Sequence, residues 1–431
     1  MTVKLDFYSE LKARGIIETS SIVDENKLKD ILNNQKMSFY IGYDPTAKSL
    51  QLGNLFAIVT MMRFQKAGHK PFILVGGATG MIGDPSGKSA DRVQLSEQTV
   101  LDNISSQKAQ LERFLDFNCG QNSAELVNNN DWIGKFSFIE FLRVVGTKFR
   151  LSEMLAKDSV KSRLSSEAGI SFCEFSYQMI QAYDFRHLAK ERNVTFQLGG
   201  ADQWGNITAG IDLARKMDGN EVHGLVIPLV TDANGNKFGK SVSGTAIYLD
   251  PEMTSPYQMY QFLLNSEDSS VIRYLKYFTF LSLDEIAVLE EKTKTEPHLR
   301  AAQKVLAEEL VKLVHGNEGL NAAKKATQIF FGEKIENLKD KDLTAIFKDV
   351  PSIEESMDSL KSGIPVLDLL AKTPLFSSKG EARRSIEQKG AYLNNDPLLD
   401  FNLVLRTENL ASETCMVLRK GKKNYCVIIF K

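Results

Sequence analysis

Cysteine and histidine are scarce in this chain of 431 residues. It contains four cysteines and five histidines, and both sets are scattered along the sequence. None of them shows the close pairing typical of a zinc site, so the sequence predicts no metal site built from these residues. Four cysteines are also too few for a disulfide framework in so long a chain. We therefore expect the protein to work in a reducing cytoplasm.

Long apolar runs are also lacking. No stretch approaches the roughly 20 apolar residues that a membrane-spanning helix requires. The first residues are mixed and charged, without the apolar core of a secretory signal. These features argue against insertion into a membrane and against export.

A P-loop for nucleotide phosphates is approached twice and completed nowhere. That motif needs a glycine, any four residues, and then Gly-Lys followed by Ser or Thr. Gly-Lys-Ser occurs at 87–89 and at 239–241, but the positions that require the first glycine hold Ile82 and Asn234. The chain therefore does not fit the P-loop NTPases.

The overall composition is that of an ordinary soluble globular protein, with 43% hydrophobic and 25% charged residues. The length allows two or three domains, each with its own core. The net charge of -1 conceals a basic C-terminal end, because residues 371–431 contain eleven Lys and Arg against six Asp and Glu. This excess is a weak indication of nucleic-acid contact, and a solvated charged surface explains it equally well.

Short apolar runs alternate with helical patterns in the first half of the chain. The runs, which are typical of buried strands, lie at 39–43, 71–75, 194–198 and 223–230. The helical patterns between them lie at 50–67, 97–115 and 172–190. This alternation predicts an α/β fold with a doubly wound parallel sheet.

From about residue 251 the helical patterns continue without strands, and the last part combines a helical pattern with β-rich runs. We therefore expect three domains. They are an α/β domain at 1–230 with a helical insertion at about 115–170, a helical domain at 251–335, and a small α+β domain at 363–431. A mobile loop at 231–250 and a linker at 336–362 would connect them.

The segment 40–54 passes from an apolar run through a polar turn into a helical pattern. In α/β folds a strand, turn and helix in this order expose backbone N–H groups that bind phosphate. Gly53, in the first helical turn, has no side chain to keep a flat ligand away from the backbone. The segment therefore predicts a nucleotide site.

Lys237 and Lys240 lie three apart in a segment rich in Gly, Asn and Ser. Both ammonium groups can reach one polyanion, and a flexible loop can close on a reaction and reopen for product release. The alternative is a surface hairpin in which the lysines are incidental.

Polar side chains also follow glycine-rich turns and share a helix face. Asp84 follows the glycines after 71–75 and suits an ammonium group, and Asp202 follows the glycines after 194–198 and suits ribose hydroxyls. Tyr177, Gln181 and Asp184 are four and three apart, so they lie on one face of the expected helix. An ordinary glycine-rich loop, a capped turn and an exposed polar face are the plain alternatives.

Together these segments resemble the bacterial-type tyrosyl-tRNA synthetases of class I. Residues 51–54, Gln-Leu-Gly-Asn, correspond to the His-Ile-Gly-His signature of class I with both histidines replaced. Residues 237–241, Lys-Phe-Gly-Lys-Ser, correspond to the Lys-Met-Ser-Lys-Ser signature. The glycine-rich, helical and turn segments fall in order between them, and residues 377–394 resemble the S4 RNA-binding fold.

The resemblance implies a Rossmann-like catalytic domain, a helical domain that binds the tRNA anticodon arm, and an S4-like RNA-binding domain. The implied enzyme is a tyrosine–tRNA ligase, which activates L-tyrosine with ATP and then transfers it to tRNA(Tyr). It implies ATP and Mg²⁺ at the site and a homodimer as the assembly. The apolar helical stretch 136–164 is either plain core or the subunit contact.

The resemblance also assigns roles to residues of this sequence. Those implied to bind tyrosine are Tyr40, Asp44, Asp84, Tyr177, Gln181, Asp184 and Gln203. Those implied to be catalytic, chiefly by neutralising the departing pyrophosphate, are Lys237, Lys240, Ser241, Thr46, Gln51 and Asn54. Those implied to hold ATP are Pro45, Gly53, Gly200, Asp202 and Lys240. Those implied to meet RNA phosphates are Arg383, Arg384 and Lys389.

Two other functions stay open at this point. A synthetase for tryptophan is the nearest alternative, but Tyr40 with Asp184 favours a phenol, because indole requires a differently placed acceptor. A catalytically silent RNA-binding protein on a synthetase scaffold is the other, since both signature histidines are replaced. The retained loop lysines and polar pocket residues argue against it.

Overall fold

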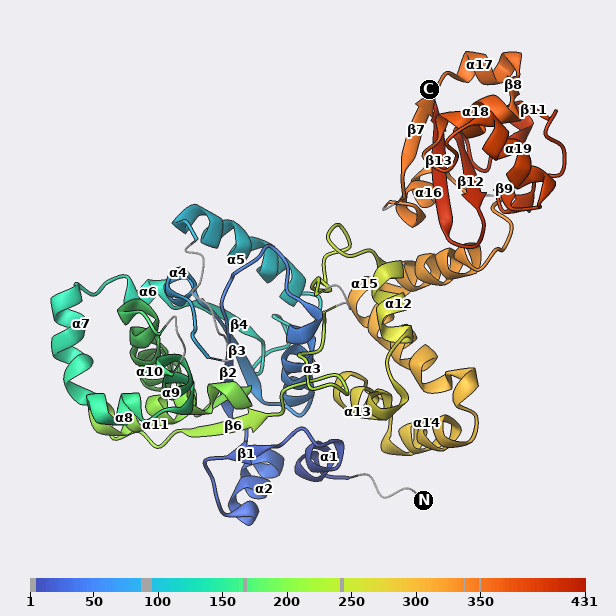
Figure 1. Cartoon of the computed structure of the whole chain (residues 1–431). Coiled ribbons are helices and arrows are strands. Elements are labelled where there is room, and N and C mark those ends of the chain that lie inside the picture. Colours follow the sequence, from blue (N-terminus) through green and yellow to red (C-terminus); the bar gives the residue numbers. More distant parts are fainter. Residues whose placement is uncertain (1–4, 87–94, 166–168, 241–243, 337, 349) are drawn as a thin grey trace. The chain divides into compact units, whose positions relative to one another are not determined.

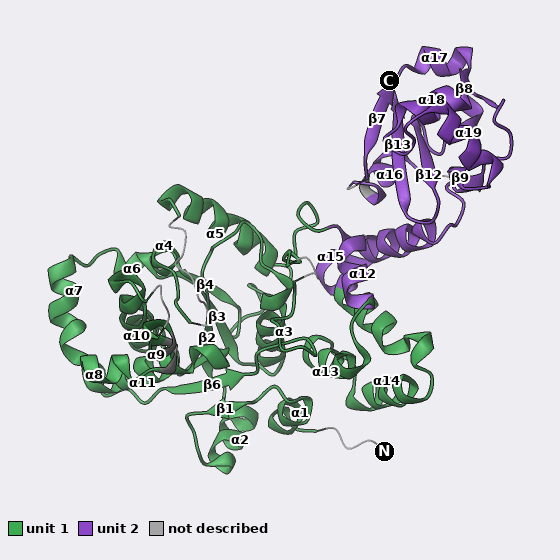
Figure 2. Cartoon of the chain, in the orientation of Figure 1, with its two compact units in different colours: residues 1–254, 265–310 green, residues 255–264, 311–431 purple. Residues whose placement is uncertain are grey.

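In a computed structural model of the chain, the described residues are 5–86, 95–165, 169–240, 244–336, 338–348 and 350–431. The chain forms two compact units (Figure 2), Met1–Thr254 with Asn265–Leu310 and Ser255–Leu264 with Val311–Lys431. Each unit contains its own β-sheet and its own hydrophobic core.

The first unit is built on a six-stranded sheet with the strand order β1-β6-β5-β2-β3-β4 (Figure 1). Its strands are β1 (Thr19–Ser20), β2 (Ser38–Tyr43), β3 (Lys70–Val75), β4 (Glu125–Asn128), β5 (Phe196–Gly200) and β6 (His223–Ile227). Neighbouring strands are parallel, except that β1 pairs antiparallel with β6 at one edge. The four expected strands and the α/β fold are therefore confirmed, and two edge strands are added, the antiparallel β1 and the parallel β4.

β2 and β3 form because apolar residues follow one another without alternation. Every residue of β3 after Lys70 is buried, and in β2 only Gly42 is exposed. Such continuous burial is typical of parallel strands that are covered on both faces. β2 lies in the middle of the sheet. β3 and β4 follow on one side of it, and β5 and β6 follow on the other, so the direction of the strand order changes next to β2. In open α/β sheets, ligands bind at this switch point, beyond the carboxyl ends of the strands.

Helices connect these strands and cover the sheet (Figure 1). The helices of this unit are α1 (Phe7–Arg14), α2 (Glu25–Asn34), α3 (Leu52–Lys66), α4 (Thr79–Ile82), α5 (Glu97–Leu111), α6 (Asn130–Ile133), α7 (Phe138–Val144), α8 (Leu151–Leu155), α9 (Asp158–Leu164), α10 (Phe172–Arg192) and α11 (Trp204–Asp218), followed after the last strand by α13 (Asp268–Phe278) and α14 (Leu283–Thr295). The expected helical insertion contains α6 to α9, but it also contains β4. Within the described ranges, no helix is long and apolar enough to cross a bilayer.

The long helix α10 is defined by signals at both of its ends. Ser171 Oγ accepts a hydrogen bond from Glu174 N at 3.1 Å, and Glu174 Oε2 accepts one from Ser171 N at 3.3 Å, which caps the start. The helix ends at Asn193, whose φ of 53° lies in the left-handed region. α11 packs along α10, and Gly210 allows the two helices to approach closely, because a Cβ atom there would lie 3.0 Å from the Phe185 side chain.

The second unit combines helices with a five-stranded sheet in the order β10-β9-β12-β13-β7 and a two-stranded pair, β11 with β8. Its strands are β7 (Ser352–Glu355), β8 (Ile364–Pro365), β9 (Ala391–Leu393), β10 (Asp396–Pro397), β11 (Val404–Leu405), β12 (Cys415–Lys420) and β13 (Asn424–Phe430). Its helices are α12 (Pro256–Leu264), the later part of α15 (Ala301–Phe330), α16 (Asp340–Ile346), α17 (Met357–Ser362), α18 (Val366–Lys372) and α19 (Lys379–Glu387).

The expectation of a linker at 336–362 is wrong. This range contains α16, β7 and α17, and β7 pairs in parallel with β13. Leu343 and Phe347 are buried in a cluster that includes Val427 of β13. Few residues in this range are apolar and many are charged, which is typical of a linker. The composition therefore did not indicate that the segment folds as part of the small domain.

A buried ion pair holds the start of α10. Two guanidinium nitrogens of Arg163, in α9, donate to the two carboxylate oxygens of Glu174 at 3.2 and 3.1 Å, and both side chains are almost fully buried. Arg163→Met should lower the free energy of unfolding by about 3–5 kcal/mol, because the buried side chain of Glu174 would lose its cationic partner. Chemical denaturation measures this loss. The double variant Arg163→Met, Glu174→Gln should recover much of it, because glutamine keeps the cap on Ser171 N without the charge. An equal loss in the double variant would contradict the explanation.

Candidate active site

The crevice at the switch point begins where β2 and β3 end. Asp44 follows β2, and Gly76, which follows β3, donates its N–H to Tyr43 O at 2.9 Å. A Cβ atom on Gly76 would lie only 2.2 Å from Asp44 Oδ1. A glycine is therefore required at this turn if the carboxylate is to stand in the crevice.

Asp44 is held by two hydroxyl groups. Thr79 Oγ1 donates to Asp44 Oδ1 at 2.8 Å, and Tyr177 OH donates to Asp44 Oδ2 at 3.0 Å. Burial, and then the negative charges of Asp44 and Asp84, raise the pKa of Tyr177 well above its usual value. Tyr177 therefore keeps its proton and remains a hydrogen-bond donor.

Asp184, on α10, is a buried carboxylate with 1% of its surface exposed. Trp132 Nε1 donates to Asp184 Oδ1 at 2.7 Å, and Asn129 Nδ2 donates to Asp184 Oδ2 at 3.0 Å. Burial raises the pKa of Asp184 to about 7, although both donors act to lower it. This carboxyl group therefore titrates near neutral pH.

The Tyr40 hydroxyl is buried and has no hydrogen-bond partner among the described residues. Burial, and then the negative charge of Asp184, raise the pKa of Tyr40 well above its usual value. A buried hydroxyl left unpaired costs about 1–3 kcal/mol. The two side chains suit a ligand hydroxyl that donates to Asp184 and accepts from Tyr40.

A chain of side-chain amides leads away from Asp84. Gln203 Nε2 donates to Asp84 Oδ2 at 2.7 Å, Gln181 Nε2 donates to Gln203 Oε1 at 3.2 Å, and Asn206 Nδ2 donates to Gln181 Oε1 at 2.9 Å. Burial is the largest influence on Asp84 and raises its pKa. A partly buried carboxylate among oriented amides suits a ligand ammonium group, which would restore its charge balance.

The segment 230–240 lies directly on the start of α3. Gly239 has a φ of 96°, and a Cβ atom there would lie 2.8 Å from Gly53 N. At the helix start, Asn54 Oδ1 accepts a hydrogen bond from Gln51 N at 2.9 Å. Asn54 thus caps α3, which is a structural role that the sequence did not indicate.

Of the residues predicted to hold ATP, Pro45, Gly200 and Asp202 lie at the carboxyl ends of β2 and β5, and Gly53 lies at the start of α3. Pro45 follows β2, as does Thr46, which is predicted to be catalytic, while Gly200 ends β5 and Asp202 lies two residues after it. Lys237 and Lys240 are exposed, and Lys237 Nζ lies 3.4 Å from Asp202 Oδ2. Ser241 lies outside the described residues.

The structure thus brings the predicted tyrosine-binding residues into two connected groups, one around Asp44 and Asp84 and one around Asp184. Four polar partners were missed by the sequence prediction: Thr79, Asn129, Trp132 and Asn206. Thr79 and Asn206 lie inside motifs that the sequence did mark. Asn129 follows the short strand β4, and only recognition of that strand could have indicated it.

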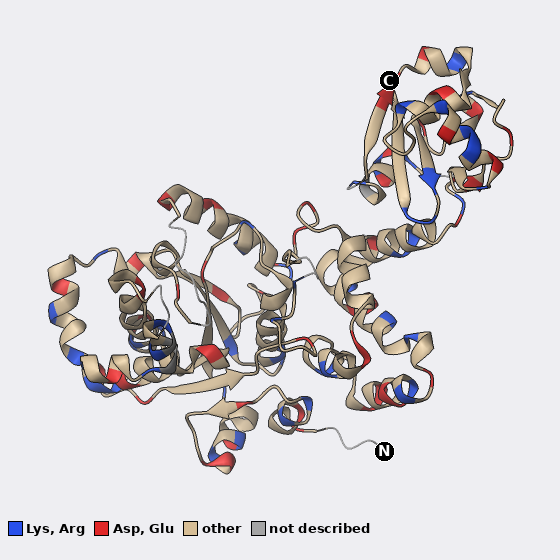
Figure 3. Ribbon diagram, in the orientation of Figure 1, with Lys and Arg blue, Asp and Glu red and all other residues tan. Residues whose placement is uncertain are grey.

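The three predicted RNA-binding residues are exposed in the second unit. Arg383 and Arg384 lie on α19, and Lys389 follows it. Figure 3 shows Lys and Arg on α19 and at the turn between β12 and β13. Arg383 Nε donates to Glu387 Oε1 at 3.0 Å, and its guanidinium lies 4.2 Å from the centre of the Phe401 ring.

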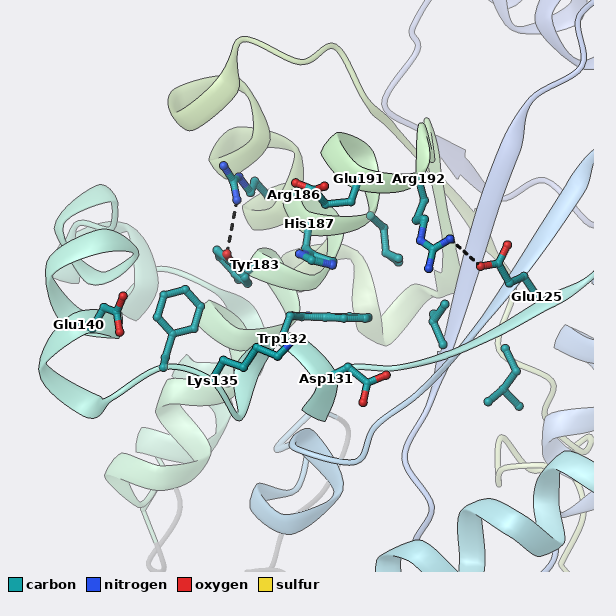
Figure 4. A pocket seen from close by; sticks show the side chains of 14 residues that line it. Glu125, Asp131, Trp132, Lys135, Glu140, Tyr183, Arg186, His187, Glu191 and Arg192 are labelled. Carbon is teal, nitrogen blue, oxygen red and sulfur yellow. Dashed lines mark hydrogen bonds and ion pairs between the residues drawn. The ribbon is translucent and has the colours of Figure 1, made fainter.

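A cavity of about 540 Å³ lies beside the Asp184 group (Figure 4). β4, α6, α7 and α10 line it, and Trp132 is shared because its indole N–H reaches Asp184 while its ring stacks on His187 at 4.3 Å. None of the predicted site residues lines this cavity. The predicted site residues lie instead at the carboxyl ends of the strands, where Asp44, Asp184 and the Tyr40 hydroxyl are found.

Comparison with models of protein families identifies the class of protein to which this chain belongs. A model described as tRNA synthetases class I (W and Y), meaning those for tryptophan and tyrosine, matches residues 32–332. A second model, the tyrosine–tRNA ligase SYY-like C-terminal domain, matches residues 342–428. The first match alone covers well over half of the chain, which is thus a class I tRNA synthetase by sequence and by fold.

Relatives that match over almost their full length show to which family within this class the chain belongs. The tyrosine–tRNA ligase of Bacillus velezensis is 49% identical over 423 residues, covering 98% of this chain and 99% of the relative. Tyrosine–tRNA ligase 1 of Bacillus subtilis is 48% identical over 424 residues, with the same coverage of 98% and 99%. The chain therefore belongs to the tyrosyl-tRNA synthetase family, as its motifs predicted.

Solved structures agree. A C-terminally truncated mitochondrial tyrosyl-tRNA synthetase of Aspergillus nidulans has a TM-score of 0.67 and 31% identity, covering 75% of this chain and 94% of that chain. A tyrosyl-tRNA synthetase of Archaeoglobus fulgidus, complexed with L-tyrosine, has a TM-score of 0.54 and 16% identity, covering 73% of this chain and 100% of that chain. The second match, at this identity, shows the fold alone.

The raised pKa of Asp184 predicts a pH dependence of tyrosine binding. Below about pH 7 the carboxyl group takes up a proton and can no longer accept a hydrogen bond from a phenol as a charged group does. The KM for tyrosine should therefore rise roughly tenfold between pH 8 and pH 6, while the KM for ATP changes little. In Asp184→Asn the KM should be high and independent of pH. A flat profile in the unmodified protein down to pH 6 would refute this assignment.

Proposed function

We propose that this chain activates L-tyrosine with ATP, giving tyrosyl-adenylate and pyrophosphate, and then transfers the tyrosyl group to the 3′-terminal ribose of tRNA(Tyr). The observation that carries the proposal is the buried pair of Asp184 and the unpaired Tyr40 hydroxyl. A carboxylate has about four acceptor positions, so Asp184 can accept from a phenol in addition to Trp132 and Asn129. Phenylalanine in the same place would satisfy neither group.

The other end of the substrate is proposed to meet the second group of side chains. Asp84 and Tyr177 would accept hydrogen bonds from the ammonium group of tyrosine, with Gln181 completing its surroundings. Asp44 and Gln203 would stand near the reacting carboxylate. Hydrogen bonds already link these residues, so the site is largely preformed.

The chemistry requires no nucleophile from the protein. The substrate carboxylate attacks the α-phosphate of ATP, and pyrophosphate leaves, so positioning and charge stabilisation supply the rate. Lys237 and Lys240 would neutralise the leaving pyrophosphate, and Thr46 and Gln51 would donate hydrogen bonds to it. Mg²⁺ would enter with the ATP phosphates and add positive charge there. Within the described part of the chain no cluster of His, Cys, Asp or Glu is arranged to hold a metal ion.

The adenosine part of ATP is proposed to lie between the start of α3 and the end of β5. Gly53 is exposed at the helix start, and Gly200 leaves room next to Asp202, which would hold the ribose. A Cβ atom on Gly200 would lie 2.9 Å from Asp202 Oδ1 and would displace that carboxylate. Both glycines therefore keep the backbone accessible to a flat ligand.

The parts after residue 250 are proposed to bind tRNA. The helices at 251–335 would contact the anticodon arm, and the small domain, which begins at α16, would contact RNA through Arg383, Arg384 and Lys389. Exposed lysines and arginines of this kind bind phosphate and make affinity dependent on salt. We also propose the cytoplasm as the site of action, where free thiols stay reduced.

Pyrophosphate exchange tests the proposed substrate. L-tyrosine should support exchange of pyrophosphate into ATP at least about a hundredfold better than L-phenylalanine, because phenylalanine leaves both Tyr40 and Asp184 unpaired. Tyr40→Phe should reduce this preference about tenfold. Stronger exchange with L-tryptophan would overturn the proposal in favour of the neighbouring family. RNA binding without exchange or tyrosyl-tRNA formation would establish the silent scaffold instead.

We further propose that the chain acts as a homodimer through α7 to α9 and the start of α10. Large apolar side chains are exposed there, including Phe138 at 64%, Ile139 at 64% and Phe172 at 65%, which is unusual for a free surface. Phe138→Asp with Ile139→Lys should yield monomers in sedimentation velocity. Val288→Asp, which charges an exposed apolar residue of α14, is the control and should stay dimeric. An unchanged dimer in the double variant would exclude this surface.

A further inference from the structure

Phe238 is the buried residue between the two exposed loop lysines. The Lys237 side chain is 53% exposed, whereas only 8% of the Phe238 surface is exposed. The backbone N–H of Phe238 donates to Val230 O at 2.9 Å, and the backbones of Lys237 and Thr231 form an antiparallel β-bridge. The aromatic ring is thus turned into the first unit while the lysines stay in solvent.

The Phe238 ring packs against two rings of α13. Its centre lies 4.4 Å from that of Tyr274 and 5.3 Å from that of Phe278. Both of these residues are almost fully buried, and they lie four apart on one face of the helix. Tyr274 and Phe278 form what we call the aromatic seat.

Polar contacts add to the aromatic seat. Thr231 O accepts a hydrogen bond from Tyr274 OH at 2.9 Å and another from Arg273 Nη2 at 2.6 Å. Both donors lie on α13. The helix therefore holds the loop at Thr231 on one side of its tip and at Phe238 on the other. The Asp232–Asn236 turn between these attachments makes no contact of this kind with α13 among the interactions of the described residues.

α13 is itself fixed to α3, the helix that begins at the nucleotide site. Phe56 of α3 stacks on Tyr277 at 4.6 Å and contacts Phe278 edge-on at 5.8 Å. Two arginines, Arg63 of α3 and Arg14 of α1, donate to the carbonyl oxygen of Thr279, which ends α13. Cations at a helix C-terminus are favourable partners of its dipole.

These contacts form a continuous support from α3 through α13 to the loop, and the loop then returns to α3. Gly239 follows Phe238 immediately and crosses Gly53 so closely that a Cβ atom would lie 2.8 Å from Gly53 N. The position of the Phe238 ring therefore determines how the backbone of residues 237–240 lies over the start of α3. The two lysines project from that backbone.

We propose that Phe238 is a positioning residue for the activation step, and that the aromatic seat on α13 sets the place of Lys237 and Lys240 over the start of α3. This inference rests on the proposed function, because it assumes that the lysines act on the pyrophosphate of ATP. Phe238 touches no reacting atom. Its effect is to hold the ammonium groups of Lys237 and Lys240 near the position of the transition state. The two side chains then lose less conformational entropy when the reaction takes place.

The test compares kcat with KM in tyrosine-dependent pyrophosphate exchange. Phe238→Ala should lower kcat about tenfold, the value of one well-packed aromatic pair, and Phe238→Leu should lower it less. The KM for tyrosine should stay within about twofold, because the Tyr40 and Asp184 groups are not in contact with the seat. Equilibrium binding of tyrosine in the absence of ATP checks that each variant keeps an intact pocket.

A double-mutant cycle shows whether the seat and Phe238 act together. Tyr274→Leu should lower kcat by a similar factor, and Phe238→Ala with Tyr274→Leu should be little worse than either single variant. Phe331→Leu is the matched control, since this ring is 81% exposed and follows α15 in the second unit. Its kcat should equal that of the unmodified protein.

The outcomes separate this inference from the function on which it rests. If the unmodified protein shows no tyrosine-dependent exchange, the proposed function fails. If it is active but Phe238→Ala keeps its kcat, or if the losses of Phe238→Ala and Tyr274→Leu multiply fully in the double variant, the positioning role is refuted. Equal losses in kcat and in tyrosine binding would likewise refute it, because they would indicate general disruption of the unit.

Discussion

The hydrogen bonds that hold the buried carboxylate of Asp184 determine the order of the whole crevice. A buried charge is tolerated only where donors replace the water it has lost. Trp132 and Asn129 are these donors, and Asn129 also donates to Thr79, which donates to Asp44. Asp184 on α10 and Asp44 after β2, which are far apart in the sequence, therefore belong to a single chain of hydrogen bonds.

The parallel sheet makes this chain of bonds possible. β2, β3 and β4 end at one edge, and the segments after them supply Asp44, Thr79 and Asn129. α10 then brings Tyr177 and Asp184 to the same place from a distant part of the sequence, at a spacing set by the helix. The fold and the site consequently depend on the same elements, and the burial that stabilises β2 and α10 is also what perturbs the ionisation of the site.

The sequence could predict those parts of the site that follow a local pattern. Asp44 and Asp84 follow recognisable turns, and Asp184 has helical spacing from its neighbours. Asn129 and Trp132 could not be predicted, because β4 is a four-residue strand with one buried residue and its neighbours bond to Asp184 only in the folded chain. β7 was missed for the same physical reason, since it is short and its partner β13 lies at the far end of the chain.

Lys237 forms an ion pair with Asp202, the residue proposed to bind the ribose hydroxyls. The two charged atoms are 3.4 Å apart and both side chains are partly exposed, so the pair is weak by itself. Because the lysine is tethered to the same chain, it would nevertheless compete with a ribose for Asp202 at a high effective concentration. A nucleoside bound at Asp202 would displace the lysine, and the displaced cation would then be available for the phosphates that follow. Binding of the sugar would in this way release the charge that the rest of the nucleotide requires.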